Sequence, residues 1–380
     1  MSKGRYVARE ISEKILEVQK YYPVTTVTGP RQSGKTSLCR HLFPDYNYVN
    51  LEDLTVRGRA IADPTGFLDS LGGTAIIDEV QNAPDILSMI QVRVDEDPDK
   101  RFILTGSSNF TLLQRMTQSL AGRAAVFTLL PFSLKEMTEE EKSVATWRLL
   151  SRGQYPGILV NGIPDEIFFS NYYTTYVERD VRDLMRIKNI MTFDTFVRLL
   201  AARVGSEFNA SQIAKEAGVS SPTVAEWLSI LDTSYITYTV RPYFANISKQ
   251  LTKMPKVYFY DTGLLCYLLG IETEEQFVSS TLRGAIFENM VISELMKNQF
   301  NQGRIPNLNF YRERSGKEVD AMVRTREGLH LYEVKAGSTF KPEFMVNMEY
   351  VSALVAGVSQ RTVVYDGPTS APLLLNLRDV

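Results

Sequence analysis

The sequence contains very few cysteines and histidines. Its 380 residues include two cysteines, Cys39 and Cys266, and two histidines, His41 and His330. Two cysteines far apart in sequence exclude a disulfide framework and a cysteine-rich zinc site, and they fit a reducing cytosol. Two histidines argue against a histidine-based metal cage and against a Ser-His-Asp triad.

Long apolar runs are also missing. No run approaches the ~20 apolar residues that a membrane-spanning helix requires, and the charged first 20 residues lack the apolar core of a signal peptide. We therefore expect a cytoplasmic protein with no membrane partner. The formal net charge of −2 argues against binding nucleic acid through bulk positive charge, although a local basic patch stays compatible with it.

The first part of the sequence alternates short apolar strands with helical patterns. We predict strands at 24–29, 48–52, 74–80, 101–108 and 124–131, with helices between them, notably 34–42 and 83–97. Continuous apolar strands that alternate with helices indicate a parallel sheet covered on both faces. The fold class is therefore α/β, and we assign residues 1–160 to the first domain.

The rest of the chain divides into two further patterns. Residues 161–275 contain aromatic-rich helices and, at 209–240, a helix-turn-helix with Gly218 at its turn, followed by a β-hairpin. This pattern predicts a helical and winged-helix domain. Residues 276–380 begin with a helix at 284–298 and continue with several strands, so we predict a third domain of α/β type.

A glycine-bracketed loop, GPRQSGKT, follows the first predicted strand. Gly29 and Gly34 allow the backbone amides between them to point at phosphate oxygens, and the helix that begins at Gly34 directs its positive end to the same place. Lys35 supplies a charge for the β- and γ-phosphates, and the Thr36 hydroxyl is a ligand for Mg²⁺. The predicted ATP-contacting residues are Gly29, Pro30, Arg31, Gln32, Ser33, Gly34, Lys35, Thr36 and Ser37.

Two acids follow the strand at 74–80, at the end where ligands bind in such sheets. We expect Asp78 to bind Mg²⁺ through its water shell and Glu79 to polarise the attacking water. After the next strand, Thr105, Ser108 or Asn109 would contact the γ-phosphate or its water, and we prefer Asn109. Arg123 either neutralises transition-state charge, in its own or a neighbouring subunit, or is a surface arginine that caps a strand.

Several segments together resemble a known family. GPRQSGKT, AIIDEV, LTGSSN, SLAGR, YVERDVRDL and GKEVDAMV…YEVKAG are similar to segments of archaeal and bacterial AAA-type ATPases with a C-terminal domain of uncertain function. The resemblance covers nearly the whole chain. It implies an AAA+ core, a helical or winged-helix middle, and a nuclease-like last domain.

The helix-turn-helix leaves two interpretations open. Its second helix, SPTVAEWLSIL at 221–231, has no Lys or Arg, which favours a lever or lid packed on the ATPase over a reader of DNA bases. Basic residues near the hairpin keep DNA contact through the wing as an alternative: Arg241, Lys249, Lys253 and Lys256. We interpret ERDVRD at 178–183 as a salt-bridged packing face, with Arg179 reaching nucleotide in a ring as the alternative.

A second cluster of charged residues lies on two predicted strands near the C-terminus. Glu333 and Lys335 are two residues apart and share a strand face, and Asp320 joins them if the strands pair in register. Two carboxylates would then bind Mg²⁺ while the lysine orients a water that attacks a phosphodiester; Glu288 would complete the cluster. The order is similar to the PD-(D/E)XK pattern of restriction-endonuclease-like nucleases, although such acids also occur on ordinary solvated strand faces.

These patterns predict an ATPase that uses ATP and Mg²⁺, coupled to a C-terminal nuclease-like domain that acts on DNA. The alternative is a nucleotide-controlled switch whose last domain binds DNA or another partner without cleaving it. A scaffold with a degenerate ATP site is disfavoured because Lys35, Thr36, Asp78 and Glu79 are all present. DNA and a second copy of the chain remain candidate partners.

Overall fold

The chain folds into two units. The computed structural model describes residues 6–107, 119–176, 190–244, 254–313, 315–369 and 373–380. The first unit comprises Met1–Phe132 with two later segments, Thr233–Tyr235 and Gln299–Ile305. The second comprises Ser133–Asp232, Ile236–Asn298 and Pro306–Val380. No helix in the described ranges is long and apolar enough to cross a bilayer.

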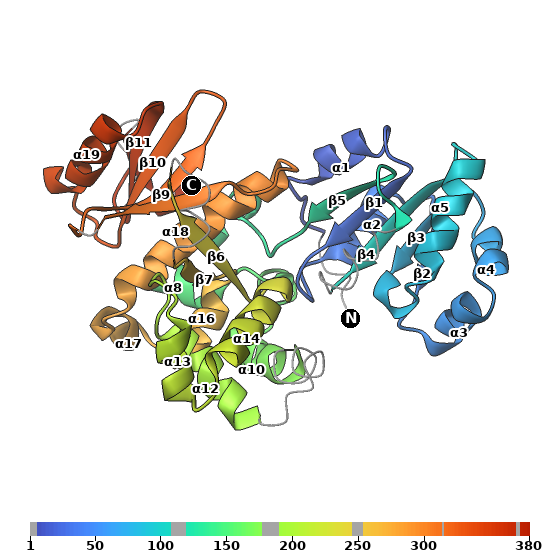
Figure 1. Ribbon diagram of the computed structural model, residues 1–380, viewed down its shortest axis with the longest axis horizontal. Helices are drawn as coiled ribbons and strands as arrows, with labels where there is room; N and C mark the ends of the chain where they lie inside the picture. The colour runs from blue at the N-terminus through green and yellow to red at the C-terminus, as the bar shows by residue number, and fades with distance from the viewer. Residues whose placement is uncertain (1–5, 108–118, 177–189, 245–253, 314, 370–372) are drawn as a thin grey trace. The chain divides into compact units, whose positions relative to one another are not determined.

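The first unit is built on a parallel sheet of five strands (Figure 1). The spatial order is β2-β3-β4-β1-β5, and every neighbouring pair is parallel. The strands are β1 (Val24–Thr28), β2 (Asn47–Asn50), β3 (Thr74–Asp78), β4 (Arg101–Gly106) and β5 (Ala124–Thr128). The prediction of a parallel α/β sheet is therefore confirmed, and the carboxyl ends of all five strands meet at one edge.

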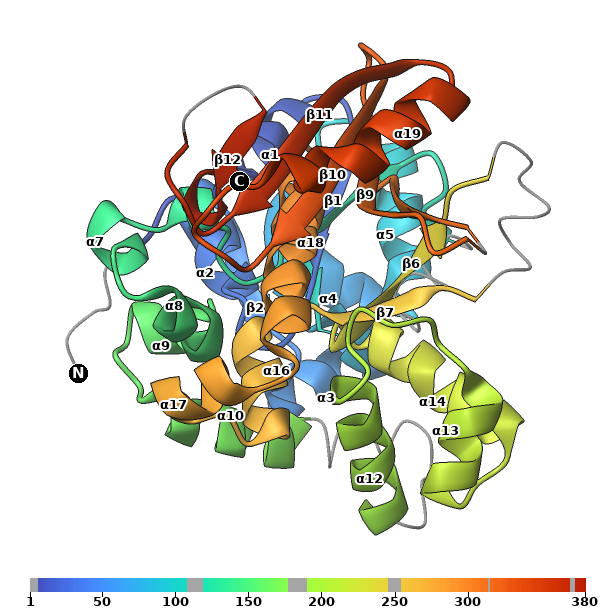
Figure 2. The same ribbon diagram turned by 90° about the vertical axis from the view of Figure 1, so that its left-hand side faces the viewer.

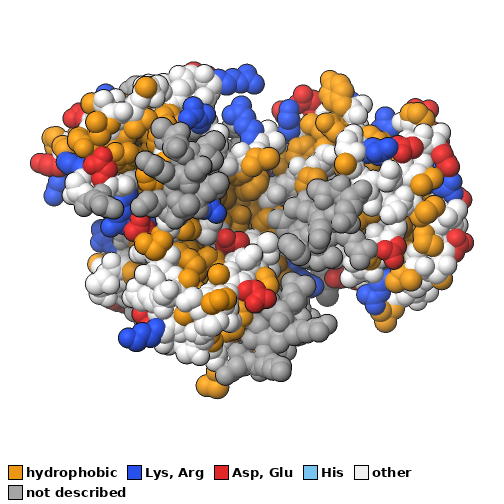
Figure 3. Space-filling model, in the orientation of Figure 1, with side chains coloured by type: hydrophobic (Ala, Val, Ile, Leu, Met, Phe, Trp, Pro, Cys, Tyr) orange, Lys and Arg blue, Asp and Glu red, His pale blue; other side chains and the backbone are white. Residues whose placement is uncertain are grey.

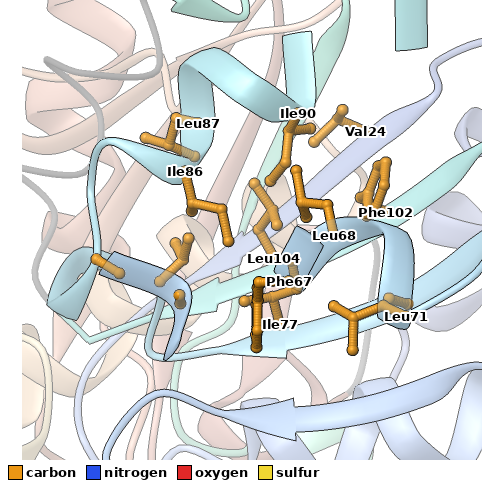
Figure 4. Close-up of a cluster of buried hydrophobic side chains, with 14 of the residues drawn as sticks. Val24, Phe67, Leu68, Leu71, Ile77, Ile86, Leu87, Ile90, Phe102 and Leu104 are labelled. Atoms are coloured by element: carbon orange, nitrogen blue, oxygen red, sulfur yellow. The ribbon is translucent and has the colours of Figure 1, made fainter. Parts of the chain in front are cut away.

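Both faces of this sheet are buried because successive strand residues point to opposite sides. Ala75 and Ile77 of β3 belong to the cluster drawn in Figure 4, which α4 (Pro64–Ser70) and α5 (Ile86–Glu96) complete with Leu68 and Ile90. Ile76 instead joins the opposite cluster, with residues of α1 (Ser12–Val18) and α2 (Lys35–Leu42). The first unit is thus a three-layer α/β fold.

Short helices connect and cover the strands of the first unit. Asp53 accepts hydrogen bonds from the amides of Thr55 and Val56 and so begins α3 (Leu54–Ala62).

On the face of the first unit drawn in Figure 3, basic and acidic side chains are interspersed. That mixture agrees with the small net charge of the whole sequence.

Helices lie before and after the first two strands of the second unit. They are α7 (Glu139–Lys142), α8 (Thr146–Arg152), α9 (Pro156–Leu159), α10 (Asp165–Tyr172), α12 (Ile190–Ala201), α13 (Ala210–Ala217), α14 (Ser221–Thr233), α16 (Thr262–Leu269) and α17 (Glu274–Ser279). Asn209 caps α13, and Gly218, at φ 70°, ends it before α14. The pair α13–α14 is followed by antiparallel strands, in the order expected, while the winged-helix interpretation stays a prediction.

A seven-stranded sheet completes the second unit, in the order β12-β11-β10-β9-β8-β6-β7. Its strands are β6 (Thr237–Pro242), β7 (Lys256–Phe259), β8 (Leu308–Arg312), β9 (Glu318–Arg324), β10 (Leu329–Lys335), β11 (Val358–Tyr365) and β12 (Leu374–Asn376). α19 (Val346–Leu354) packs on β9 and β10 (Figure 2), and the long α18 is Arg283–Asn301. Strands from 161–275 and from 276–380 therefore share one sheet; the boundaries between the three predicted domains stay predictions.

Candidate functional site

The GPRQSGKT loop connects the end of β1 to the start of α2. Gly29 has φ 142° and Gly34 has φ 95°, conformations that a side chain strongly disfavours. A Cβ atom on Gly29 would lie 2.1 Å from the carbonyl oxygen of Leu129, so this glycine also allows a close approach of two backbone segments. Arg31, Gln32 and Ser37 are exposed and Pro30 is buried. The loop therefore depends on glycine at both of its ends.

The first turn of α2 presents Lys35 to this loop. The Lys35 side chain is buried, and its Nζ donates to the carbonyl oxygens of Gly29 at 3.0 Å and Pro30 at 2.8 Å. Burial lowers the pKa of Lys35 to about 8, although Glu79 and Asp78 act in the opposite direction. The free amides at the start of a helix and a lysine beside them form a site for an anion.

Asp78, the last residue of β3, lies next to Thr36. The Thr36 Oγ1 donates to Asp78 Oδ2 at 2.8 Å, and the Tyr48 hydroxyl donates to the same oxygen at 2.9 Å. Thr105, at the end of β4, donates to Asp78 Oδ1. A hydroxyl and a carboxylate side by side at a phosphate cradle are oxygen ligands of the kind that Mg²⁺ prefers, so the donors present fit this ion.

Glu79 turns toward the neighbouring strand. It adopts φ 54°, and its Oε2 accepts from the amide and the hydroxyl of Ser107 at 3.3 and 3.1 Å and also from Gln81. All these bonds use Oε2, which leaves Oε1 without a partner among the described residues. The Glu79 amide donates to Thr105 Oγ1 at 3.3 Å. Glu79 is therefore fixed at the same sheet edge as Asp78, with one oxygen available.

The other predicted residues of this site fall into two groups. Asn109, Ser108 and the ERDVRD segment lie outside the described residues. Arg123 is paired with Asp95, with Nε at 2.5 Å from Oδ1 and Nη2 at 2.8 Å from Oδ2. Both interpretations of Arg123 stay predictions.

Three residues of the site were missed in the sequence. Tyr48 and Ser107 contact the two acids, and Arg9, which is buried, donates to the carbonyl oxygens of Ser33 at 3.0 Å and Leu130 at 2.7 Å. Ser107 directly follows β4, so its place at the sheet edge was predictable, whereas Tyr48 lies inside β2 and reaches Asp78 with its hydroxyl. Nothing in the local pattern around Arg9 indicated its contact with the loop.

The second predicted site lies on β9 and β10, which pair antiparallel. Asp320 Oδ2 accepts from the Val334 amide at 2.7 Å, and Lys335 Nζ donates to Glu333 Oε1 at 2.7 Å. Glu333 Oε2 is buried and has no hydrogen-bond partner. A buried carboxylate oxygen without a donor is costly, so it indicates a place for a cation or a donor from a ligand.

Glu288, on α18, points to this cluster but has other partners. Its Oε1 accepts from the Tyr258 hydroxyl at 2.6 Å and from Lys256 Nζ at 3.2 Å. Burial, and then the nearby Asp320 carboxylate, raise the pKa of Glu288 and of Glu333 each to about 7. Tyr258 was not predicted as part of this site, and Lys256 was predicted only as a DNA contact.

The described residues contain no group of three or more His, Cys, Asp or Glu side chains arranged to bind a metal. Of the three predicted acids, Glu333 has a buried oxygen, Oε2, without a hydrogen-bond partner. The assignment of Glu288, Asp320 and Glu333 as a set of metal ligands stays a prediction.

Three domain families match the chain in succession. Residues 21–138 match an AAA domain. Residues 144–275 and 283–378 match two domains of unknown function, DUF8612 and DUF4143.

Similar proteins span most of the chain. The uncharacterized protein Rv2008c of Mycobacterium tuberculosis is 29% identical over 371 residues, which are 96% of this chain and 81% of that protein. The uncharacterized protein MJ1544 of Methanocaldococcus jannaschii is 23% identical and covers 84% of this chain and 76% of its own length. Among solved structures, a Walker-type ATPase of Pyrococcus abyssi has a TM-score of 0.47 at 16% identity, over 68% of this chain and 95% of that one.

The domain match and the site geometry agree on the first unit. The AAA domain match includes β1, the phosphate loop, α2 and the Asp78–Glu79 pair. The AAA domain match of residues 21–138 and the geometry of the loop together support an AAA-type P-loop ATPase.

Proposed function

We propose that the chain hydrolyses ATP with Mg²⁺ and couples hydrolysis to a C-terminal nuclease-like domain that acts on DNA. The observation that carries the first part is the 2.8 Å hydrogen bond between Thr36 Oγ1 and Asp78 Oδ2. It brings a hydroxyl and a carboxylate together at the start of α2, directly beside Lys35.

Each residue of the ATP site has a role in this proposal. The backbone amides of residues 29–36 other than Pro30, at the loop and the start of α2, bind the phosphates, and Lys35 adds a positive charge for the β- and γ-phosphates. Thr36 and Asp78 would hold Mg²⁺, which neutralises phosphate charge when bound. Glu79, oriented by Ser107, uses its available Oε1 to orient the attacking water and accept its proton.

Steady-state ATP turnover tests this site. We expect Lys35→Ala and Glu79→Gln each to lower the turnover rate by roughly 100-fold or more, because one removes charge stabilisation and the other the proton acceptor. Lys20→Ala and Glu96→Gln are matched controls at exposed positions of the same unit, and should turn over ATP like the unaltered protein. Turnover that survives both site changes would exclude this site as the source of activity.

The second candidate function is a nucleotide-controlled switch that binds DNA or another partner without cutting it. Two observations favour it: Glu288 Oε1 is bonded to Lys256 and Tyr258, and the described residues offer no group of three acids to a metal. The unpartnered Glu333 Oε2 supports the nuclease instead.

Incubation with plasmid or branched DNA and Mg²⁺ or Mn²⁺ separates the two functions. Cleavage that is lost in Asp320→Ala and Lys335→Ala, and kept in the exposed control Lys341→Ala, supports the nuclease. DNA that stays intact with every metal and substrate, while ATP turnover responds to DNA, supports the switch.

A further inference from the structure

Lys256, the first residue of β7, has its charged group inside the second site. Its side chain is 2% exposed. The Nζ atom lies 2.5 Å from Glu318 Oε1 and 3.2 Å from Glu288 Oε1. It also lies 5.2 Å from the centre of the Phe310 ring. A lysine enclosed in this way cannot turn its ammonium group to solvent without breaking several contacts.

The backbone at Lys256 is fixed as well. In the antiparallel pair of β6 and β7, Lys256 lies opposite Val240, and it also forms an isolated bridge with Glu207. β6 in turn pairs with β8, and β8 pairs with β9, which carries Glu318 and Asp320. The position of the ammonium group is therefore set by the sheet, not by a mobile loop.

Two lysines divide the carboxylates of the site between them. Lys335 binds Glu333 on one side, and Lys256 binds Glu288 and Glu318 on the other. Burial raises the pKa of Asp320, and the charges of both lysines lower it. The four carboxylates are those of Glu288, Glu318, Asp320 and Glu333. When all four are ionised, the two lysines offset half of their negative charge, and one divalent cation offsets the other half. Arg312, 3.5 Å from Glu318, approaches from the more exposed rim, where water screens its charge.

The two sides differ in what they offer to a metal. On the Lys335 side, Glu333 Oε2 is buried and unpartnered. On the Lys256 side, Glu288 Oε1 already has two donors, Lys256 and Tyr258. A second metal ion there would lie close to a buried ammonium group, where like charges repel strongly because little water screens them.

We propose that Lys256 is a fixed internal cation that takes the place of a second metal ion, so that this site binds one divalent cation, on the Asp320 and Glu333 side. The inference rests on the metal-binding part of the proposed nuclease-like site. It requires neither ATP turnover nor DNA cleavage. Lys256 is thus a positioning residue, which keeps Glu288 and Glu318 away from the metal.

Counting bound Mn²⁺ tests the inference with the full chain and no nucleotide. Electron paramagnetic resonance titration gives the number of Mn²⁺ ions bound per chain. The ions that the double variant Asp320→Asn/Glu333→Gln still binds belong to other sites, such as Thr36–Asp78, and are subtracted from this number. We expect the unaltered chain to bind one ion at the cluster. Lys256→Met should bind a second ion, because Glu288 and Glu318 lose their ammonium partner, whereas Lys256→Arg should still bind one.

Lys256→Met removes the ammonium partner of Glu288 and Glu318 and leaves them only Tyr258 and Arg312 among the described residues, which will reduce its stability. Lys256→Met/Glu318→Gln removes one charge of each sign and serves as the matched variant; we expect it to fold and bind one ion. Mn²⁺ should raise the melting temperature of Lys256→Met more than that of the unaltered chain.

The outcomes separate the two proposals. Two ions at the cluster in the unaltered chain, or one ion in folded Lys256→Met, would overturn the role of Lys256. No ion at the cluster in any variant would overturn the proposed metal site itself.

Discussion

Gly29 shows how a single residue sets the shape of the phosphate loop. Its φ of 142° and its close approach to Leu129 both exclude a side chain. We expect Gly29→Ala to lower the free energy of unfolding of the first unit by about 1–3 kcal/mol, because the added methyl group overpacks the site. It should also weaken nucleotide binding, since the loop must shift to relieve the clash.

Gly58 provides the matched control. It lies inside α3, and nothing lies within 4 Å of the place where its Cβ would be. Gly58→Ala should therefore raise stability by about 0.5–1 kcal/mol, because alanine loses less backbone entropy in a helix. Urea unfolding and binding of a fluorescent ATP analogue measure both effects; unaltered stability and affinity in Gly29→Ala would contradict the close approach.

At the scale of elements, Asp232 connects the end of α14 to the start of β6. Its Oδ1 accepts from the Thr237 hydroxyl at 2.5 Å. Burial raises the pKa of Asp232 to about 7, against a smaller opposite effect of this hydrogen bond. In the unfolded chain the pKa is near its ordinary value of about 4, so between pH ~4 and ~7 the folded state binds a proton that the unfolded state lacks. The free energy of unfolding therefore falls as pH rises through this range.

Asp232→Asn should remove this fall, because asparagine keeps an oxygen for Thr237 and has no charge to bury. The variant is expected to match the unaltered protein near pH ~4 and to exceed it near pH ~8 by a few kcal/mol, at ~1.4 kcal/mol for each pKa unit. Urea unfolding across pH measures the difference, with the exposed Asp99→Asn as control. If the free energy of unfolding changed with pH in the same way for Asp232→Asn and the unaltered chain, Asp232 would not be the cause of the fall.

The elements also show what a sequence can and cannot predict. The shared place of the GPRQSGKT loop, Asp78 and Glu79 was predictable because each lies at the end of a strand whose parallel neighbours end at the same edge. Lys256 was not assigned to the second site, because its contact with Glu318 depends on the pairing of β7 with β6, β6 with β8 and β8 with β9. Such a contact follows from strand order, and no local pattern around Lys256 indicates that order.

At the scale of the whole molecule, the chain enters the first unit again at Thr233–Tyr235, between α14 and β6 of the second. Tyr235 is buried, and its hydroxyl lies 2.9 Å from Thr28 Oγ1, in the residue before the phosphate loop. Its φ of 58° is rare for a large side chain, and such strain persists where surrounding contacts require it. The last residues of α18 belong to the first unit in the same way.

Tyr235 is therefore the residue through which we expect nucleotide binding to affect α14 and β6. A bound nucleotide orders the loop that begins beside Thr28, and Tyr235 is joined to both elements through the backbone. A non-hydrolysable ATP analogue should slow amide hydrogen exchange in residues 221–242. Tyr235→Phe, which removes only the hydroxyl, should reduce this protection while the affinity for the analogue changes little. The exposed Tyr21→Phe is the control. Equal protection in Tyr235→Phe and the unaltered chain would show that the hydroxyl contact does not transmit the effect of the nucleotide.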